Sequence, residues 1–195
     1  MTRRHVTESA AGRLLFDRLA GPYERLMPPA DGTRLRAGID LAEGPVRRGV
    51  DLGGGPGRGA RAVGEVDWTV VDVADGMLRR ARRRGLTAVA GDATQLPVRE
   101  GTVDAVLVVD ALHHIPDHEA VLCEAARVLR PGGVVVLREF DPLTVRGRAL
   151  VAAEAAVGFD STFWTPDSLA GALERAGLSA RVLDRGFGYT VAGVV

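Results

Sequence analysis

Residues 50–59 read Val50-Asp51-Leu52-Gly53-Gly54-Gly55-Pro56-Gly57-Arg58-Gly59. The pattern predicts the end of a buried strand, a glycine turn, and a helix that begins near Gly57 and ends near Gly64. Glycine permits positive φ in such a turn and lets a ligand approach the backbone without a Cβ in the way. The free N–H groups and the positive dipole end of the helix attract negative charge. This stretch therefore predicts a ligand site where a strand passes into a helix.

Two kinds of ligand fit the glycine spacing. Gly55-x-Gly57-x-x-Ala60 fits the dinucleotide fingerprint, in which the helix end holds a pyrophosphate. The spacing Asp51-x-Gly53-x-Gly55-x-Gly57 instead places a carboxylate at the strand end, where it would repel a pyrophosphate and suit an ammonium group. A tail with both an amino group and a carboxylate, such as the methionine part of S-adenosylmethionine, would satisfy Asp51 and the helix end together. The rest of the chain has to distinguish the two.

The composition predicts one cytoplasmic domain. The chain has 195 residues, 25 basic and 25 acidic, and a formal net charge of +0. The length suffices for one hydrophobic core, and the neutral charge gives no reason to expect a nucleic acid or a membrane as partner. The single Cys123 excludes an internal disulfide and fits a reducing compartment. No signal peptide or membrane span is evident, so we expect a cytoplasmic monomer or homodimer with a small-molecule partner.

The chain divides into a helical preface and a regular core. In the preface, the apolar pattern of residues 14–27 is followed by Asp31, which is placed to cap a helix carrying Leu35 and Ile39. From Gly49 onward strand and helix patterns alternate, which predicts a parallel sheet with helices on both faces. The first expected strand ends at Leu52, and the next four span residues 68–72, 87–90, 103–109 and 134–137. A helix terminator at residues 130–133 precedes the last of these strands. Two final strands, 180–184 and 188–194, predict an antiparallel hairpin.

Helix caps are also visible in the core. Asp75, Asp117 and Thr165 are expected to cap helices, the last with Pro166 at the first helical position. A further helix is expected over residues 149–156. Phe159, Phe163 and Trp164 follow it in a loop, where aromatic side chains commonly form the wall of a pocket.

Carboxylates follow successive strands. Asp72 ends the second strand, where its two oxygens match the vicinal diol of a ribose. Asp92 follows the third strand and could accept the exocyclic amine of adenine, although a plain turn explains Gly91-Asp92 almost as well. Together with Asp51, these acids favour a nucleoside ligand. Asp110 follows the fourth strand.

Two adjacent histidines, His113 and His114, follow Asp110 at the place where the ligand cleft should open. Histidine is suited to proton transfer near neutral pH, but a packing role is the simpler interpretation. Because neighbouring loop residues rarely point the same way, we expect at most one of them to face a substrate. His114 and His118 with Cys123 lack a second clustered ligand pair, so no metal site is predicted; a magnesium site from Asp110, Asp117 and Asp141 is likewise not favoured.

Several motifs, in order, resemble the class I S-adenosylmethionine-dependent methyltransferases. Besides the glycine stretch they are Val71-Asp72-Val73-Ala74-Asp75-Gly76-Met77-Leu78, Gly91-Asp92-Ala93, Ala111-Leu112-His113-His114-Ile115 and Arg127-Val128-Leu129-Arg130-Pro131-Gly132-Gly133. Within the class they most resemble the small-molecule group related to the ubiquinone/menaquinone biosynthesis C-methyltransferases, as does Phe16–Glu24, with Glu24 where Asp is more usual. The expected fold class is α/β: a doubly wound, Rossmann-like seven-stranded sheet, mostly parallel with a C-terminal antiparallel hairpin. It would form one domain, 1–195, with an N-terminal helical cap (1–45) and a cofactor-binding core (46–195).

The resemblance implies S-adenosylmethionine as cofactor and a set of residues that bind it. Asp51 and the turn at Gly53, Gly54 and Gly55 would hold the methionine part, Asp72 the ribose, Val73 and Met77 the base, and Asp92 with Ala93 the adenine edge. Tyr23 would close over the methionine end, and backbone groups at Asp110 would contact the cofactor. The implied activity is methyl transfer to a small acceptor, which we expect to be aromatic or quinone-like.

Two other functions stay open. One is a protein that binds the cofactor without catalysis, such as a regulatory subunit. The other is a nicotinamide-dependent reductase that uses Gly55–Ala60. No Asn-Pro-Pro-Tyr-type sequence follows the fourth strand, which disfavours amino methylation of DNA bases.

Overall fold

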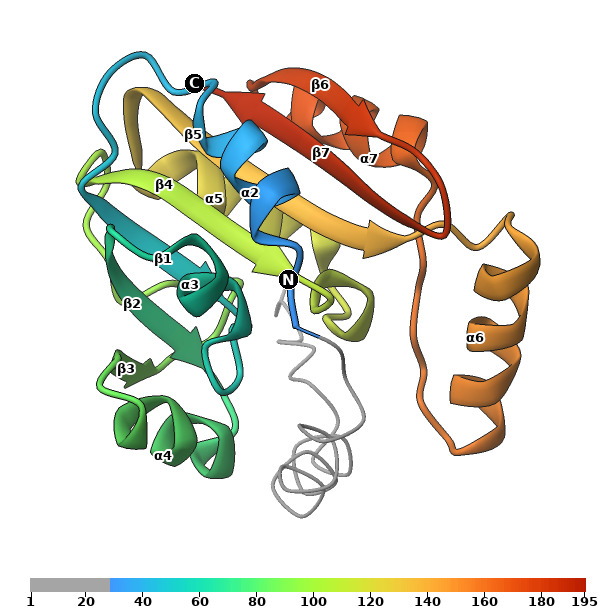
Figure 1. Cartoon of the computed structure of the whole chain (residues 1–195). Coiled ribbons are helices and arrows are strands. Elements are labelled where there is room, and N and C mark those ends of the chain that lie inside the picture. The colour runs from blue at the N-terminus through green and yellow to red at the C-terminus, as the bar shows by residue number, and fades with distance from the viewer. Residues whose placement is uncertain (1–28) are drawn as a thin grey trace, which may run out of the picture.

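A seven-stranded sheet forms the centre of the computed structural model, which describes residues 29–195 (Figure 1). In spatial order it is β3-β2-β1-β4-β5-β7-β6. The bounds are β1 (Arg48–Leu52), β2 (Asp67–Asp72), β3 (Thr87–Ala90), β4 (Val103–Val109), β5 (Leu129–Phe140), β6 (Ser179–Asp184) and β7 (Gly188–Val194). The first five strands are parallel, and β7 is antiparallel to both β5 and β6. The predicted fold class is confirmed. Tyr23 and the helical pattern at residues 14–27 lie outside the described residues.

Helices cover both faces of the sheet. They are α2 (Gly32–Ile39), α3 (Arg58–Val63), α4 (Asp75–Arg83), α5 (His118–Val128), α6 (Val145–Ala156) and α7 (Pro166–Arg175), with a short 3₁₀ helix η1 (Leu112–His114) after β4. Apolar residues of α2, α3 and α4 share one core cluster, and those of α5 and α7 share the other. Figure 1 shows α2 and α3 in front of the sheet and α5 and α7 behind it, while α6 stands beyond the end of β5.

Side-chain caps begin most of these helices. Asp31, Asp117, Thr144 and Thr165 each accept an N–H of the first turn. Thr144 explains why α6 begins at Val145, earlier than predicted. The prediction for Asp75 is wrong: it is the first residue of α4, and Ala74 occupies the capping position without a side-chain bond. The acid at the end of β2 explains the difference, because Asp72 Oδ1 accepts the N–H of Ala74 at 2.8 Å.

Strand β5 begins earlier than the sequence predicts. It starts at Leu129, directly after α5, and Leu129 pairs with Val103 while Val134 pairs with Ala105. The four intervening residues, Arg130–Gly133, form an irregularity inside the strand, with Gly132 at φ +72°. Gly132 also donates to Val195 O at 3.1 Å. The Pro-Gly-Gly sequence thus follows the end of α5, while backbone hydrogen bonds continue through it along β5.

The strand order reverses between β1 and β4. Strand β1 pairs with β2 on one side and with β4 on the other, and β4 continues to β5. In open α/β sheets, ligands bind outside the carboxyl ends of the strands at such a reversal. The turns after β1 and β4 are therefore the first places to look for a site.

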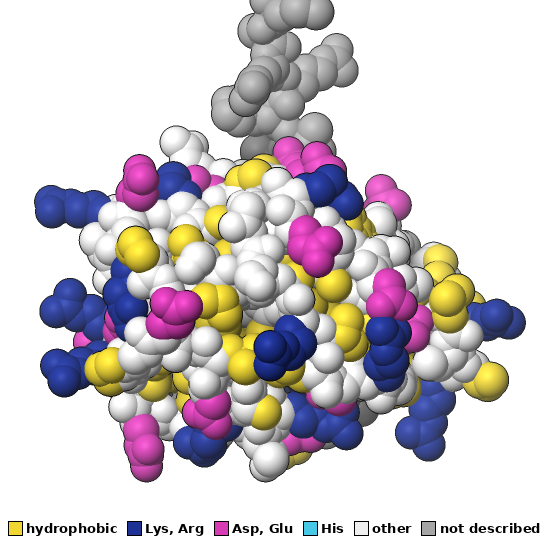
Figure 2. Space-filling view, turned by 90° about the horizontal axis from the view of Figure 1, so that it is seen from above, with side chains coloured by type: hydrophobic (Ala, Val, Ile, Leu, Met, Phe, Trp, Pro, Cys, Tyr) yellow, Lys and Arg dark blue, Asp and Glu magenta, His cyan; other side chains and the backbone are white. Residues whose placement is uncertain are grey.

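The surface carries charges of both signs. Figure 2 shows acidic and basic side chains interspersed on the face seen from above, with no broad field of one sign. Among the helices between residues 29 and 195, none has the length and apolar character needed to cross a membrane.

A glycine in β1 leaves room for the buried indole ring of Trp68 on β2. Gly49 pairs with Trp68, and a Cβ on Gly49 would lie 2.1 Å from the indole ring. We expect Gly49→Ala to lower the free energy of unfolding by about 1–3 kcal/mol, because the buried ring would have to move. Urea unfolding with an unchanged m-value would measure this.

Gly171→Ala in α7 is the matched control. The nearest atom to its Cβ would be a guanidinium nitrogen of Arg175 at 3.6 Å. This change should raise the free energy of unfolding by up to about 1 kcal/mol, since alanine favours helix. A Gly49→Ala variant as stable as the wild type would show that the Trp68 ring does not need the space that Gly49 leaves.

Candidate active site

The turn after β1 is built around a buried carboxylate. Gly53, Gly55 and Gly57 have φ of +61°, +53° and +78°, and Gly57 occupies the capping position of α3. A Cβ on Gly54 would lie 2.5 Å from Asp51 Cγ, and one on Gly59 would lie 2.9 Å from Asp51 Oδ1. The glycines therefore provide both the left-handed backbone and the space for Asp51.

Asp51 has one oxygen satisfied and one available. It is 0% exposed, and its Oδ2 accepts the N–H of Ala60 at 2.9 Å. Its Oδ1 has no hydrogen-bond partner within residues 29–195. Burial raises the pKa of the Asp51 carboxyl to about 7; the bond from Ala60 opposes this rise, and the negative charge of Asp72 adds to it. A cationic donor would satisfy Oδ1 and stabilise the ionised form.

A small cavity adjoins this carboxylate. Its volume is about 30 Å³, and its lining includes Asp51, Gly53, Gly54, Gly55, Arg58 and Asp110. That space holds roughly one water molecule. Arg58 has the longest side chain among the lining residues, so its movement would enlarge the cavity most.

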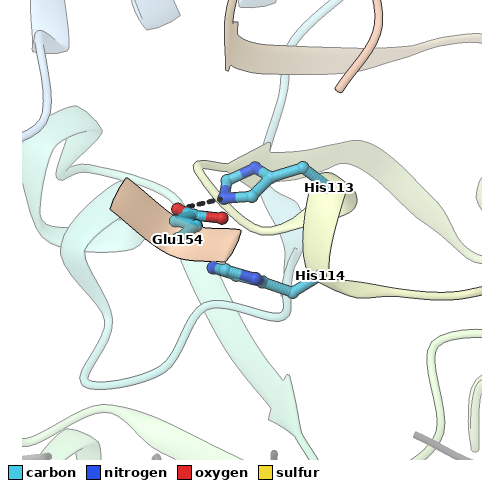
Figure 3. A group of neighbouring side chains, drawn as sticks. All are labelled: His113, His114 and Glu154. Atoms are coloured by element: carbon cyan, nitrogen blue, oxygen red, sulfur yellow. Dashed lines mark ion pairs between the residues drawn. The ribbon is translucent and has the colours of Figure 1, made fainter. Parts of the chain in front are cut away.

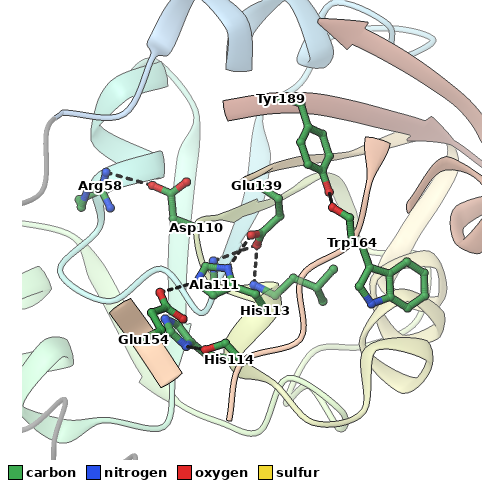
Figure 4. A network of polar contacts seen from close by, with 11 residues as sticks. Arg58, Asp110, Ala111, His113, His114, Glu139, Glu154, Trp164 and Tyr189 are labelled. Atoms are coloured by element: carbon green, nitrogen blue, oxygen red, sulfur yellow. Dashed lines mark hydrogen bonds and ion pairs between the residues drawn. The ribbon is translucent and has the colours of Figure 1, made fainter. Parts of the chain in front are cut away.

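Arg58 connects the turns that follow β1 and β4. Its Nη2 lies 3.2 Å from Asp110 Oδ2, with the two side chains 13% and 9% exposed (Figure 4). Asp110 has φ +52°, which is uncommon for a residue other than glycine. Burial raises the pKa of the Asp110 carboxyl, and the charge of Glu139 adds to the rise. The sequence analysis did not identify Arg58 as a site residue. Its position as the one cation within the glycine stretch could have indicated this role.

Asp72 lies beside the same turn, as predicted. Its Oδ2 accepts the N–H of Gly55 at 2.8 Å, and its Oδ1 accepts that of Ala74 at 2.8 Å. The Cβ position of Gly55 is 3.8 Å from Met77 Sδ and 4.0 Å from Asp72 Oδ2. The structure thus brings Gly55, Asp72 and Met77 together at the tip of β2. Val73, which follows, is half-buried.

Asp92 forms a turn at the exit of β3. It is exposed, and its Oδ1 accepts from Thr94 N at 2.8 Å and from Thr94 Oγ1 at 2.7 Å. This is the plain turn that the sequence allowed. A contact between adenine and Asp92 or Ala93 stays a prediction.

Glu139 holds the turn after β4. This buried carboxylate accepts the N–H groups of Ala111 at 3.1 Å and Leu112 at 2.7 Å, and it lies 2.6 Å from His113 Nδ1 (Figure 4). Because a carboxylate accepts, Nδ1 of His113 donates, and Nε2 is directed toward Glu154 Oε1 at 3.8 Å. Burial lowers the pKa of His113, but Glu139 and Glu154 outweigh it and raise the pKa above its usual value.

The two histidine rings lie close together, although neighbouring loop residues rarely point the same way; whether only one of them faces a substrate stays a prediction. Their centroids are 4.0 Å apart, because the Nδ1 bond to Glu139 turns His113 into the site. His114 Nδ1 lies 3.1 Å from Ser161 Oγ. Burial, together with the charge of His113, lowers the pKa of His114 to about 3. The site also contains Glu154 of α6 (Figure 3), which sequence reasoning did not identify.

The predicted aromatic loop packs over these histidines. Phe163 stacks on His113 with centroids 4.6 Å apart, and Phe159 lies 5.2 Å from His114. An open groove of about 430 Å³ adjoins the loop and is lined by Phe163, Trp164, Thr165, Ser168 and Arg175. His118 instead packs against Trp164, and Cys123 is exposed, so these two do not join a cluster with His114.

Comparison with known proteins identifies the family. Residues 50–137, from β1 to β5, match the model of the methyltransferase domain family. The chain is 38% identical over 128 residues to the demethylmenaquinone methyltransferase of Mycolicibacterium vanbaalenii, a match that covers 59% of this chain and 56% of that protein. The chain thus contains a methyltransferase domain of the class I S-adenosylmethionine-dependent type. The predicted resemblance is therefore confirmed.

A further relative and a solved structure agree with this match. The demethylmenaquinone methyltransferase of Thermobifida fusca is 32% identical over 149 residues, which cover 67% of this chain and 61% of the relative. The chain thus spans roughly half to three fifths of the length of these two curated relatives. A structure described as an S-adenosylmethionine-dependent methyltransferase from Thermotoga maritima has a TM-score of 0.77 and 23% identity over 93% of this chain and 98% of that one. This last similarity shows the fold.

The raised pKa of Asp51 predicts a pH-dependent stability. The carboxyl holds its proton more tightly in the folded chain, so stability is highest below the pKa of the unfolded chain and declines until the pH passes about 7. The pKa difference, 3.8 to about 7, corresponds to a loss on the order of 4 kcal/mol. We expect Asp51→Asn to become progressively more stable than the wild type between about pH 4.5 and about pH 8, as measured by urea unfolding. A constant difference between the two proteins would contradict the burial of an ionisable Asp51.

Proposed function

We propose that this methyltransferase transfers the methyl group of S-adenosylmethionine to a small acceptor of aromatic or quinone-like character. The observation that carries the cofactor assignment is the buried Oδ1 of Asp51, which lies beside Gly59 at the start of α3 and has no hydrogen-bond partner within residues 29–195. A pyrophosphate would be repelled there, whereas the ammonium group of a methionine tail would bind. This argument disfavours the nicotinamide-dependent reductase.

The charges around the cavity suit both ends of an amino acid. The ammonium group would bind Asp51, and the carboxylate would bind Arg58 once the guanidinium turns from Asp110. Helix α3 has only 6 residues, so Arg58, more than the helix dipole, supplies the positive charge. The tail would then occupy the crevice where the strand order reverses.

The nucleoside would extend across the neighbouring strand ends. Asp72 would accept the ribose hydroxyls, with Val73 and Met77 against the base and Asp92 with Ala93 at its edge. The proximity of Met77 Sδ and Asp72 Oδ2 to Gly55 supports this placement. Tyr23 lies outside the described residues and keeps its proposed role over the methionine end.

The cofactor supplies an electrophilic methyl group, and the protein has to align the acceptor and exclude water. His113 and His114 lie after β4, with Phe159 and Phe163 packed on them, and form the acceptor side of this proposal. Neither imidazole is poised as a base: the pKa of His113 is raised by its carboxylates, and that of His114 is lowered to about 3. We therefore infer that they position an acceptor that is already electron-rich, such as a hydroquinone or phenolate ring. The names of the curated relatives point to the same class.

Asp72→Ala tests the cofactor site. It should weaken binding of S-adenosylhomocysteine about a hundredfold, because the variant loses the acceptor for the ribose diol and for Gly55 N. Asp75→Ala, exposed on the first turn of α4, is the control and should bind normally. Gly55→Val should also lose binding, since its φ is +53°. Calorimetric titration measures the affinity of the wild type and of the three variants for S-adenosylhomocysteine. If the wild type binds NADH and not S-adenosylhomocysteine, the nicotinamide-dependent reductase becomes the better interpretation.

Transfer of a labelled methyl group tests the acceptor class. We expect label from tritiated S-adenosylmethionine to enter a reduced, ring-demethylated naphthoquinone or a catechol at least about tenfold faster than an aliphatic amine. Label entering only the amine would contradict the aromatic acceptor. Tight cofactor binding with no transfer to any acceptor of a cell extract would support a binding protein without catalysis.

A further inference from the structure

Three side chains with metal-ligand chemistry converge beside the turn after β4. His113 and His114 come from η1, and Glu154 comes from α6, well separated in sequence. One ligand atom from each lies within 4.8 Å of the others. Figure 3 shows the carboxylate of Glu154 between the two imidazole rings. We propose that these residues form a binding site for one divalent transition-metal ion.

The donor set selects the class of ion. Two imidazoles and one carboxylate suit Zn²⁺, Co²⁺, Fe²⁺ or Mn²⁺ better than Mg²⁺ or Ca²⁺, which prefer oxygen ligands. Ligand bonds of about 2.0–2.2 Å in a tetrahedral site place neighbouring ligand atoms roughly 3.4 Å apart. His113 Nε2 and Glu154 Oε1 are already 3.8 Å apart. The other pairs of ligand atoms lie within 4.8 Å, so rotations of the three side chains would close the remaining gaps.

Contacts behind the ligands orient both rings. His113 Nδ1 donates to Glu139 at 2.6 Å, which directs Nε2 into the group. A histidine bound to a metal through one nitrogen usually donates its other N–H to a carboxylate in this way. Glu139 is itself fixed by Ala111 N and Leu112 N. His114 Nδ1 is held near Ser161 Oγ at 3.1 Å.

The carboxylates around the group favour a dication. Glu154 Oε2 is buried and has no hydrogen-bond partner within residues 29–195, which is costly for a carboxylate oxygen. Glu139 and Asp110 add negative charge nearby, as their effects on His113 show. Of the residues of α6, only Gly147 is buried, so packing does little to hold this helix near η1. A metal ion coordinated by Glu154 and both histidines would link α6 to η1. It would also keep coordination positions open for water or an acceptor oxygen.

Cobalt titration of the chelator-treated full chain tests this site. We expect one Co²⁺ to bind per chain and to give visible d–d absorption. Added Zn²⁺ should displace the Co²⁺ and abolish this absorption. His114→Ala and Glu154→Gln should each weaken binding at least about tenfold, because each removes one ligand. His118→Ala removes a buried histidine outside the group and should bind as the wild type does. Glu154 lies on a mostly exposed helix, so its variant should remain folded, which circular dichroism verifies.

Thermal unfolding gives a second measurement. Saturating Zn²⁺ should raise the Tm of the wild type and of His118→Ala but not that of Glu154→Gln. Absence of a 1:1 complex, or equal weakening in His118→Ala and Glu154→Gln, would overturn the proposal and leave a hydrogen-bonded cluster of structural function. Neither measurement needs cofactor or acceptor, so failure here leaves the proposed methyl transfer unaffected.

Discussion

The loops at the carboxyl edge of the sheet depend on carboxylates that accept backbone N–H groups. Turns have no ladder partner for these groups, so another acceptor has to be supplied. The acids are Asp51 for Ala60, Asp72 for Gly55 and Ala74, and Glu139 for Ala111 and Leu112. Each carboxylate comes from a strand; Asp72 and Glu139 fix neighbouring turns, and Asp51 fixes the first turn of helix α3. The backbone that would meet a ligand is therefore tied to the strands of the sheet by hydrogen bonds.

This arrangement concentrates negative charge in a buried region. Burial raises the pKa values of Asp51 and Asp110, and each acid is further affected by a neighbouring one. Arg58 offsets part of this charge through its ion pair with Asp110, and His113 offsets part through Glu139. Electrostatic interactions are stronger where water is excluded. Both the sulfonium-bearing cofactor and a metal ion would bring the positive charge that this edge lacks.

Local sequence patterns predicted the sheet well, because alternating apolar runs and turn residues depend on neighbours in the chain. They also put Asp51 and Asp72 at the carboxyl ends of strands, and the structure has Asp51 as the next-to-last residue of β1 and Asp72 as the last residue of β2. The start of β5 was missed because the pairing of Leu129 with Val103 is a long-range contact. The same reason hid Glu139 and Glu154: their partners lie far away in sequence, and no pattern within α6 marks Glu154. The direction of the His113 ring depends on Glu139 and could not be deduced from the loop.

Helix α6 buries less of its surface against the rest of the protein than the other helices between residues 29 and 195 do. It contributes one buried residue, Gly147, and carries exposed apolar side chains at or beside its ends, Val145 and Val157. Substitutions along most of α6 would thus cost little folding free energy. The part of the chain that stands over the histidines can diversify while the sheet stays unchanged, so evolution or an engineer could retarget this domain to new acceptors by altering one peripheral segment.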